Sequence, residues 1–541
     1  MRRLPVIRLT YARLALLVFG IWTGVFLFGF ALSAFAAEAR STGLGPVADA
    51  EELYRQARLR DAERGLSEYL LEKPGADQDP EKRAAYFVLV RYRALFAGLE
   101  SATGAAGFYL APREFQGLLT RSPDTAQLRL LYKFALRSTG DASPLPPQEL
   151  GAEATLALAR LRQDQGETEI ALKLYRHGLE LLRRSESAAS KKQLALARAG
   201  MLDALVELGW YVEFVETMSS PGFSAIADEF HTYIYRLKTG RYLAMIPPLV
   251  RHESGKYETR WVLAGLSAGA CWLVFLLHMG RARHWPGHVF VLAVFALALG
   301  ALSAYGTIVA LLITEEYLPF SKLEPTFTNE LIHMVFGVGL REELLKLLLF
   351  IPLTPFLMRK NNATVLTVAA LVGLGFAIEE NILYYADYGG GVIIARFLTA
   401  NFLHMSLTGF AGYYLVAALR RGGESWSDFA AQFGLVILLH GAYDFLLGGQ
   451  VENGGFLAML VHIWLSYQFL SLFARLDSGG ARRLPMTYVF VGSMALLAGI
   501  GYLMLLPELG VAEAIRSSIV ELLGVATITV VFFVSFREPI G

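Results

Sequence analysis

The stretch LREELLKLLLF, residues 340–350, places four charged side chains inside an apolar run. The residues before it read LIHMVFGVG and those after it read IPLTPFLM, both with the composition of a membrane-spanning helix. The four charges fall close together: Arg341, Glu342, Glu343 and Lys346. An ionised group in hydrocarbon costs several kcal/mol, so charges in this place indicate a shared polar site rather than contact with lipid.

The whole chain has the composition of a membrane protein. Of its 541 residues, 54% are hydrophobic and 18% are charged, which is too apolar for a soluble protein of this length. The formal net charge of +1 gives no reason to expect a nucleic acid as partner. The single cysteine, Cys271, excludes a disulfide within the chain and a zinc site built from cysteines.

Residues 1–40 are expected to be a signal anchor or a signal peptide. Basic residues precede an apolar run from Leu14 to Ala36, which ends in a small-residue pattern typical of a cleavage site. The run is also long enough to span a membrane, which favours an uncleaved anchor. Either reading exports the residues that follow.

Residues 41–255 are rich in Ala, Leu, Glu and Arg, and their apolar residues recur at helical spacing. Within them, GETEIALKLYRHGLEL resembles the second helix of a tetratricopeptide repeat, through Gly166, Ala171, Tyr175 and Leu179. RDAERGLSEYLLEKP is a weaker match of the same kind. We expect an all-helical, tetratricopeptide-like domain that offers a surface to a protein partner. A helical bundle without repeats remains the alternative.

Residues 256–541 are expected to cross the membrane about nine times. The apolar segments are 261–279, 286–313, 331–358, 363–387, 391–419, 428–448, 456–474, 486–506 and 517–536. The basic residues between them fall on alternate connections: Arg281 and Arg283; Arg359 and Lys360; Arg420 and Arg421; Arg475, Arg482 and Arg483. By the positive-inside rule these connections are cytoplasmic, so residues 41–255 lie outside and the C-terminus inside. The predicted fold is all-α: a polytopic transmembrane helical bundle with an N-terminal soluble helical-repeat-like domain.

Ionisable side chains recur at similar depth on four consecutive predicted spans. At about 1.5 Å per residue they fall in or near the middle third of the bilayer. They come with two neighbours of interest, Phe376 and Asn381, and in chain order the set is Glu342, Glu343, Lys346, Phe376, Glu380, Asn381, His404, His440 and Asp444. Spacing of four residues puts Glu342 with Lys346, and His440 with Asp444, on one helix face. Alignment over four helices indicates one water-accessible cavity.

Two hydrolytic chemistries fit these residue types. Two imidazoles and a carboxylate suit zinc with an open position for water, while another carboxylate moves the proton. Alternatively, a glutamate activates water without a metal and the imidazoles stabilise the oxyanion. A rival of another class is a proton-coupled transporter or channel in which the same Glu, His and Asp residues form a relay. A third possibility is a non-catalytic relative that binds membrane proteins.

Four short motifs resemble those of the PrsW family of intramembrane proteases, which are related to the CAAX-prenyl endopeptidases. They are EELLK from Glu342, FAIEEN from Phe376, the helix with His404 and HGAYD from His440. Their order on successive spans matches as well, over roughly residues 300–450. The resemblance implies hydrolysis of a peptide bond in or near a membrane segment, in the cytoplasmic (inner) membrane of a bacterium. An anti-sigma factor is one substrate that it suggests.

The resemblance also implies roles for the residues. Glu342 and Glu343 would supply the general base. Glu380, His404 and His440 would complete the catalytic site, either as ligands of a metal such as zinc or as oxyanion donors. Lys346, Phe376, Asn381 and Asp444 would support them. The large exported domain departs from the compact plan of the family.

Other positions carry expectations that concern packing. Gly337 and Gly339, with Gly373 and Gly375, would let the two glutamate-bearing helices approach closely. Two further ionisable residues are expected to serve the membrane boundary: Arg396 as a snorkelling side chain and His462 as an interfacial one.

Overall fold

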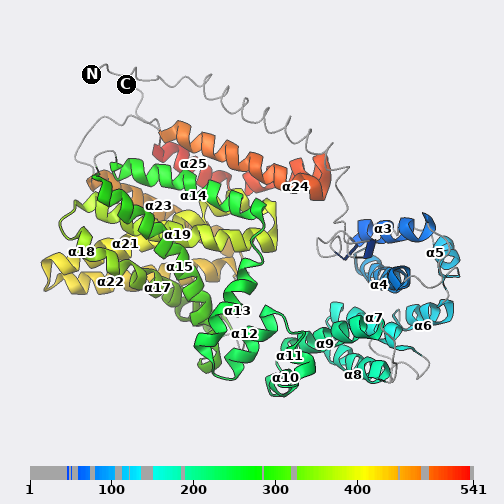
Figure 1. Ribbon diagram of the computed structural model, residues 1–541. Helices are drawn as coiled ribbons and strands as arrows, with labels where there is room; N and C mark the ends of the chain where they lie inside the picture. Colours follow the sequence, from blue (N-terminus) through cyan, green and yellow to red (C-terminus); the bar gives the residue numbers. More distant parts are fainter. Residues whose placement is uncertain are drawn as a thin grey trace. The chain divides into compact units, whose positions relative to one another are not determined.

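The computed structural model describes residues 46–47, 50–51, 59–72, 80–103, 112–120, 122, 124–135, 150–183, 189–282, 285–318, 324, 326–448, 451–476 and 486–536. Every secondary-structure element in these ranges is helical (Figure 1). The all-α class predicted from the sequence is therefore confirmed. The expected signal anchor lies outside the described residues.

The chain forms two compact units, with the division between Arg251 and His252. The helices of the first unit are α3 (Leu59–Glu72), α4 (Pro80–Thr103), α5 (Pro112–Leu119), α6 (Thr125–Ala135), α7 (Ala152–Asp164), α8 (Thr168–Arg183), α9 (Ala189–Glu207), α10 (Tyr211–Met218), α11 (Pro221–Ser224) and α12 (Glu229–Lys238). Helix α13 (Tyr242–Ser254) runs across the division.

Helix α8 packs against α7 and α9 through small and aromatic residues. The turn from α7 needs a left-handed backbone, which Gly166 adopts with φ of 78°. Helix α8 then buries Ala171, Tyr175 and Leu179. A Cβ at Gly200 of α9 would lie 2.3 Å from Cζ of Tyr175, so the glycine lets α9 rest on the ring. Descent from tetratricopeptide repeats stays a prediction.

His231 of α12 is a buried histidine between two aspartates. Its Nε2 lies 3.0 Å from Oδ1 of Asp203, and its Nδ1 lies 2.8 Å from Oδ1 of Asp228. Burial acts to lower the pKa of His231, but the hydrogen bonds and charges of the two aspartates outweigh it. The net effect is a pKa above the usual 6.5.

This shift predicts how the stability around α12 depends on pH. A raised pKa means that the folded state holds the proton more tightly, so the stabilisation is full at acidic pH and is lost as pH rises through the folded-state pKa. Protection of the α12 amides against hydrogen exchange, corrected for intrinsic rates, should fall over that interval in the full-length protein. His231→Gln should abolish the pH dependence, while His177→Gln should retain it. Equal pH dependence in both variants would contradict the assignment.

The second unit holds the apolar helices. They are α14 (Thr259–Met279), α15 (Gly287–Tyr317), α16 (Phe327–Ile332), the π-helix η3 (His333–Gly339), α17 (Leu340–Phe350), η4 (Ile351–Leu353), α18 (Thr354–Leu357), α19 (Asn362–Tyr388), η5 (Gly390–Val392), α20 (Ile393–Leu398), α21 (Ala400–Arg421), α22 (Ser425–Leu447), α23 (Gly454–Leu476), α24 (Met486–Gly524) and α25 (Ala526–Phe536).

Seven helices of this unit are long and apolar enough to cross a membrane, and a bent pair can supply an eighth. The bent pair joins Leu509–Gly524 to Ala526–Phe536 at 61°, where a single span at 517–536 was expected. The expected span at 331–358 is not among the seven. Its residues form five short helical elements, one of them a π-helix, and carry the charged cluster. The chain is thus a multi-pass membrane protein. The expected number of nine spans stays a prediction, because residues 327–357 are helical throughout although they are not among the seven.

Helices α19 and α21 form the centre of the bundle. Of the apolar windows in these spans, 78% and 72% of residues are buried, against 33–39% for α14, α15, α22 and α23. Glycines permit the close approach: a Cβ at Gly373 would lie 2.2 Å from the carbonyl O of His404, and one at Gly375 would lie 2.1 Å from that of Leu297. Helix α19 therefore meets the backbones of α21 and α15 directly.

The glycines were expected to bring the two glutamate-bearing helices together. Instead, they contact other helices. A Cβ at Gly339, at the start of α17, would lie 2.8 Å from the carbonyl O of Ile437 and 3.0 Å from the N of Gly441. Gly339 thus brings α17 to the helix of His440, and Gly373 brings α19 to the helix of His404. The expectation was wrong because spacing along one helix does not reveal which neighbour faces it.

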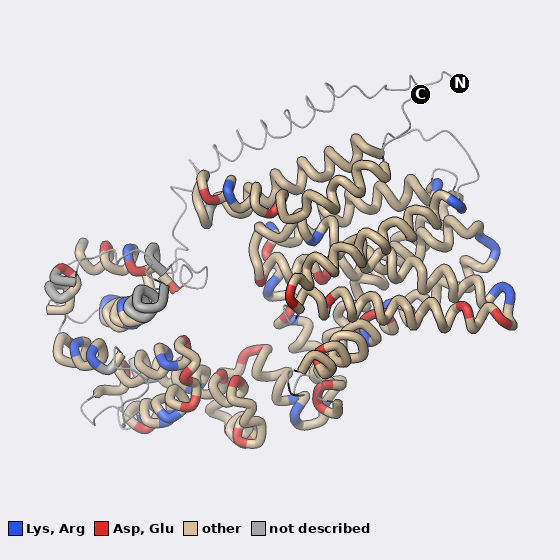
Figure 2. Tube along the Cα trace, turned by 180° about the vertical axis from the view of Figure 1, so that it is seen from behind, with Lys and Arg blue, Asp and Glu red and all other residues tan. Residues whose placement is uncertain are grey.

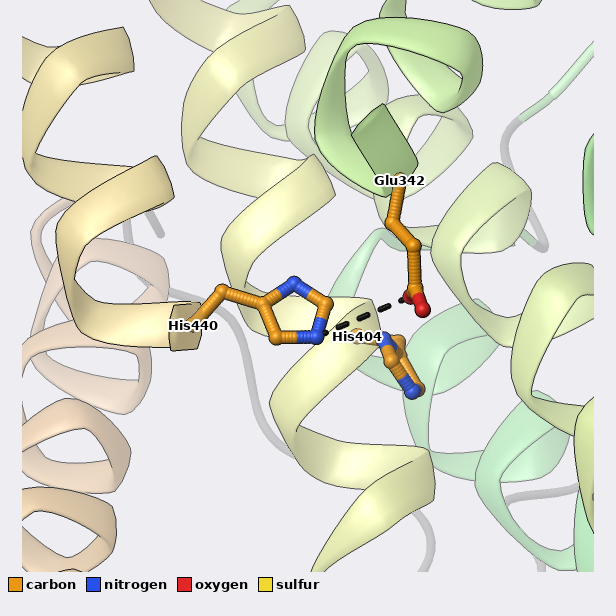
Figure 3. A group of neighbouring side chains, drawn as sticks. All are labelled: Glu342, His404 and His440. Carbon is orange, nitrogen blue, oxygen red and sulfur yellow. Dashed lines mark ion pairs between the residues drawn. The ribbon is translucent and has the colours of Figure 1, made fainter. Parts of the chain in front are cut away.

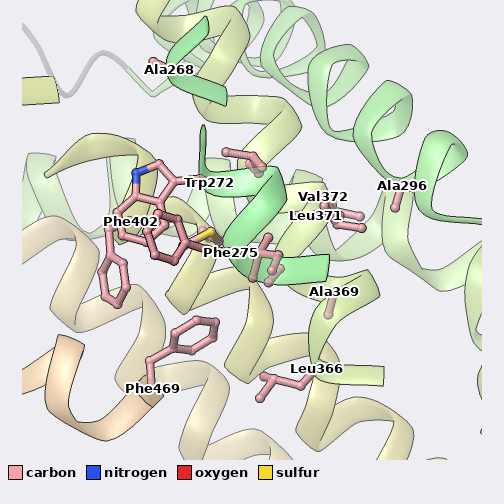
Figure 4. Packing of buried hydrophobic residues seen from close by; sticks show 14 of the residues in the cluster. Ala268, Trp272, Phe275, Ala296, Leu366, Ala369, Leu371, Val372, Phe402 and Phe469 are labelled. Atoms are coloured by element: carbon pink, nitrogen blue, oxygen red, sulfur yellow. The ribbon is translucent and has the colours of Figure 1, made fainter. Parts of the chain in front are cut away.

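Aromatic side chains fill the bundle beside these central helices (Figure 4). The Trp272 ring lies 5.1 Å from that of Phe275 and 5.3 Å from that of Phe402. Its Nε1 donates a hydrogen bond of 2.7 Å to the carbonyl O of Phe397, so the polar atom of the buried indole is satisfied. The contact fixes α14 against the end of α20.

Charged residues of this unit gather mainly near helix ends, as Figure 2 shows. At one end, Arg420 donates to the carbonyl oxygens of Leu357 and Lys360 and to Oδ1 of Asn362. Lys360 Nζ lies 2.7 Å from Nε2 of His288. The start of α15, the α18–α19 connection and the end of α21 thus meet at a basic end of the bundle, which is consistent with the predicted cytoplasmic side.

The contact at Gly373 can be tested by adding one methyl group. Gly373→Ala should lower the free energy of unfolding by about 1–3 kcal/mol, because the carbonyl of His404 cannot move without moving α21. Gly434→Ala on α22 is a matched control, since a Cβ there meets nothing within 4 Å. It should be neutral or stabilising by up to about 1 kcal/mol. Denaturation of both variants in the same detergent measures the difference; equal midpoints would contradict the packing.

Candidate active site

The ionisable side chains expected from the sequence meet inside the bundle, carried by α17, α19, α21 and α22. Lys346 is 0% exposed, Glu343 and His440 are 1% exposed, and His404 is 3% exposed. Glu342 is 9% exposed. So many buried polar groups are tolerated only when they satisfy one another.

Lys346 is the centre of this cluster. Its Nζ lies 2.8 Å from Oε1 of Glu343, 3.3 Å from Oε2 of Glu342 and 2.8 Å from Nδ1 of His404. It also lies 3.8 Å from the centroid of the Phe376 ring, a cation–π contact. The ammonium therefore uses its three donors on three acceptors and its remaining side on an aromatic face.

The contacts of His404 determine which of its nitrogens carries the proton. An ammonium can only donate, so Nδ1 of His404 accepts from Lys346. In a neutral imidazole the proton is then on Nε2, which lies 2.9 Å from Oε2 of Glu380 and donates to it. His404 is thus held between a cation on one side and a carboxylate on the other.

His440 approaches the two glutamates of α17 from the opposite side. Its Nδ1 lies 2.8 Å from Oε1 of Glu343, so Nδ1 donates to that carboxylate. Its Nε2 faces Oε2 of Glu342 at 3.6 Å and Oδ2 of Asp444 at 3.4 Å. Thr408 Oγ1 lies 3.5 Å from the second oxygen of Glu343. Glu343 is therefore enclosed, whereas Glu342 faces the imidazoles.

One atom each from Glu342, His404 and His440 lies within 4.8 Å of the others (Figure 3). Two imidazoles and one carboxylate are a donor set of hydrolytic zinc sites. Each imidazole also has a carboxylate on another nitrogen, Glu380 for His404 and Glu343 for His440, as is typical of metal-binding histidines. The donor types fit a divalent metal, which would have to take the place of the Lys346 ammonium at Nδ1 of His404. The expected metal ligands were Glu380, His404 and His440, whereas this group contains Glu342 in place of Glu380.

Besides His404, Glu380 contacts Arg396, which was expected at the membrane boundary. Nη2 of Arg396 lies 2.7 Å from Oε2 of Glu380, and Nε lies 2.5 Å from Oδ1 of Asn381. Asn381 in turn donates to Oδ1 of Asn401 at 2.7 Å. The expectation of a snorkelling Arg396 was wrong, because its acidic partner comes from another helix. An arginine inside a predicted span could itself have indicated an acidic partner within the bundle.

His462 also differs from its expected position at the membrane boundary. It is 0% exposed, and its ring packs 5.6 Å from that of Phe402 and 6.2 Å from that of Phe532. It therefore belongs to the aromatic core rather than to the interface.

The side chains of the cluster differ in how far they are exposed. Side-chain exposure is 30% for Asp444, 21% for Glu380, 16% for Arg396 and 11% for Glu342, against 0% for Glu343 and Lys346. The partly exposed carboxylates are therefore those of Asp444, Glu380 and Glu342, whereas Lys346 and Glu343 are enclosed. A carboxylate beside two imidazoles within a buried cluster is suited to hydrolysis.

The fold and the site define a class: a multi-pass helical membrane protein with a carboxylate–imidazole centre inside its bundle. Residues 289–472 match the family described as PrsW family intramembrane metalloprotease. The chain is accordingly an enzyme, a hydrolase of the intramembrane protease kind. Comparison with curated proteins and with solved structures gives no significant match.

The buried ammonium yields a prediction about stability. Lys346→Met should leave Glu343 as an uncompensated buried charge and lower the free energy of unfolding by about 3–5 kcal/mol. The double variant with Glu343→Gln should recover part of that loss, with a coupling energy of about 0.5–3 kcal/mol.

Denaturant titration of the detergent-solubilised variants measures both quantities. Arg516→Met is the control, because Arg516 and Glu513 form an exposed pair with side chains 76% and 59% exposed. Its effect should stay within about 0.5 kcal/mol. Additive effects of the Lys346 and Glu343 changes would contradict the pairing.

Proposed function

We propose that the chain is an endopeptidase that hydrolyses a peptide bond in or near the membrane segment of another membrane protein. The observation that carries the proposal is the grouping of Glu342, His404 and His440 within a cluster buried in a membrane bundle. Single-span proteins, among them an anti-sigma factor, are the proposed substrates, since one helix can approach such a bundle through the lipid.

In the route without a metal, Glu342 is proposed as the residue that takes a proton from the attacking water. It is the more exposed glutamate of α17, and it faces His440 across 3.6 Å. The same carboxyl group can return the proton to the leaving amine. Glu343 is enclosed by Lys346, His440 and Thr408, so its proposed role is to hold His440 and the ammonium in place.

The imidazoles are proposed to stabilise the negative charge that develops on the peptide carbonyl, while the buried Lys346 ammonium holds His404 and Glu343 in place. Nothing in these side chains has to reorganise for this, because their partners already orient them. When bound, a divalent metal would supply Lewis-acid activation of water and carbonyl, held by Glu342, His404 and His440. Zinc is the proposed metal, because imidazole and carboxylate donors together suit it.

We also propose the topology deduced from the sequence: residues 41–255 outside the cytoplasmic membrane of a bacterium and the C-terminus inside. In that arrangement the first unit can recruit or sense substrates. In a Cys271→Ser background, Val212→Cys should react with an impermeant maleimide in intact spheroplasts, since Val212 is 78% exposed. Glu424→Cys, on the connection between α21 and α22, should react only after lysis. The opposite pattern would reverse the topology.

Cleavage by purified protein tests the function. Wild type, Glu342→Gln and His404→Ala are incubated in liposomes with a panel of single-span membrane proteins, and the products are read by mass spectrometry. Both variants should lose at least about 100-fold in kcat/KM. Asp428→Asn, an exposed carboxylate of α22, is the matched control and should retain activity.

Metal content and chelator sensitivity are measured on the same samples. Stoichiometric zinc in the wild type, lost with His404→Ala, would support the metal-dependent route; full activity after chelation would support the glutamate route. A folded wild type that cleaves nothing, while the variants alter proton flux in liposomes, would favour the transporter alternative.

A further inference from the structure

Arg396 is joined to the cluster through Glu380. Its guanidinium stacks 3.5 Å from the centroid of the Tyr384 ring and donates to Glu380 and to Asn381. Oε2 of Glu380 thus receives two donors at once: Nη2 of Arg396 at 2.7 Å and Nε2 of His404 at 2.9 Å. The position of this one oxygen decides where the Nε2–H of His404 points.

This arrangement matters because the other nitrogen of His404 accepts from Lys346. With Nδ1 engaged by the ammonium, a single tautomer satisfies both contacts, the one with the proton on Nε2. Without Arg396, Glu380 would lose the charged hydrogen bond that fixes the position of its Oε2. His404 would then have no fixed acceptor on its Nε2 side.

The short helix that carries Arg396 is held from the end of the chain. Backbone N–H groups of Ile394 and Ala395 donate to Oε1 of Glu521, at 2.7 and 3.1 Å. These are first-turn amides of α20, which have no partner within their own helix. Glu521 lies in the second half of α24, beyond the end of the segment that matches the protease family at residue 472.

A second contact joins the same two parts of the chain. A Cβ at Gly390 would lie 2.8 Å from Cβ of Met504 and 3.1 Å from the carbonyl O of Gly501. The turn before α20 therefore packs directly on the backbone of the first half of α24. Gly510, which has φ of 76°, divides α24 into two helical segments. The first contacts this turn near Gly501, and the second caps α20 through Glu521.

We propose that Arg396 is a positioning residue that fixes the tautomer of His404 through Glu380, and that Glu521 holds Arg396 in place from outside the matched segment. The C-terminal helix α24 would then help to position residues of the active site. The inference rests on the proposed function only for its second readout, cleavage; the state of the imidazole is measured directly.

The test uses full-length protein labelled with ¹⁵N-histidine in liposomes. The chain has ten histidines, and His404→Asn identifies the signals of His404. Solid-state NMR should find one tautomer in the wild type, protonated on Nε2. Arg396→Met should replace it by a mixture, and Arg396→Lys should restore it in part. Should the methionine variant fail to fold, Arg396→Gln carries the same test.

Glu521 is tested in the same way. Glu521→Leu should disturb the His404 signals, while Glu521→Gln, which keeps an acceptor oxygen, should preserve them. Glu513→Leu on the same helix, whose carboxylate is exposed, is the matched control and should leave the signals unchanged. In the cleavage assay, Arg396→Met and Glu521→Leu should lower kcat by about 10–100-fold with little change in KM.

Two results would overturn the inference. Unchanged His404 signals in folded Arg396→Met or Arg396→Gln would remove the positioning role of Arg396. Unchanged signals in Glu521→Leu would remove the role of the C-terminal helix. If the signals change as expected but the wild type cleaves no protein of the panel, the inference stands and the proposed function is the part that fails.

Discussion

The ammonium of Lys346, buried between two carboxylates and an imidazole, is the interaction on which the rest of the bundle depends. Each of these groups alone would be too costly to place among apolar helices, and together they satisfy one another. Because Lys346 contacts Glu342, Glu343 and His404, it ties α17 to α21. The cluster is therefore both the chemical centre and a fixed point of the packing.

Backbone contacts at glycine supply the distances that this cluster needs. Gly373 places α19 against the carbonyl of His404, and Gly339 places α17 against Gly441, one residue after His440. Side chains of ordinary length can then meet across four helices. A larger residue at either glycine would separate the very helices that carry the imidazoles and the glutamates, so packing and chemistry cannot be varied independently here.

Helical periodicity was enough to predict the all-α class, and the shared depth of charged residues was enough to predict one cluster. Neither property was enough to identify the hydrogen-bond partner of every polar side chain. Arg396 and His462 were assigned to the membrane boundary because a single span reveals depth but not direction. The π-helix η3 was missed as well, since an apolar composition does not distinguish π-helical from α-helical turns.

The sequence by itself determined the membrane class, the helical fold and the residue types of the site, because hydrophobic length and buried charge are properties of the chain. Tertiary structure alone decided that Glu342 lies near both His404 and His440 while Glu380 pairs with His404 and Arg396, and that Glu521 caps the helix of Arg396. The physical reason is that hydrogen-bond partners across helices are chosen by helix rotation and close approach, which depend on all neighbours at once.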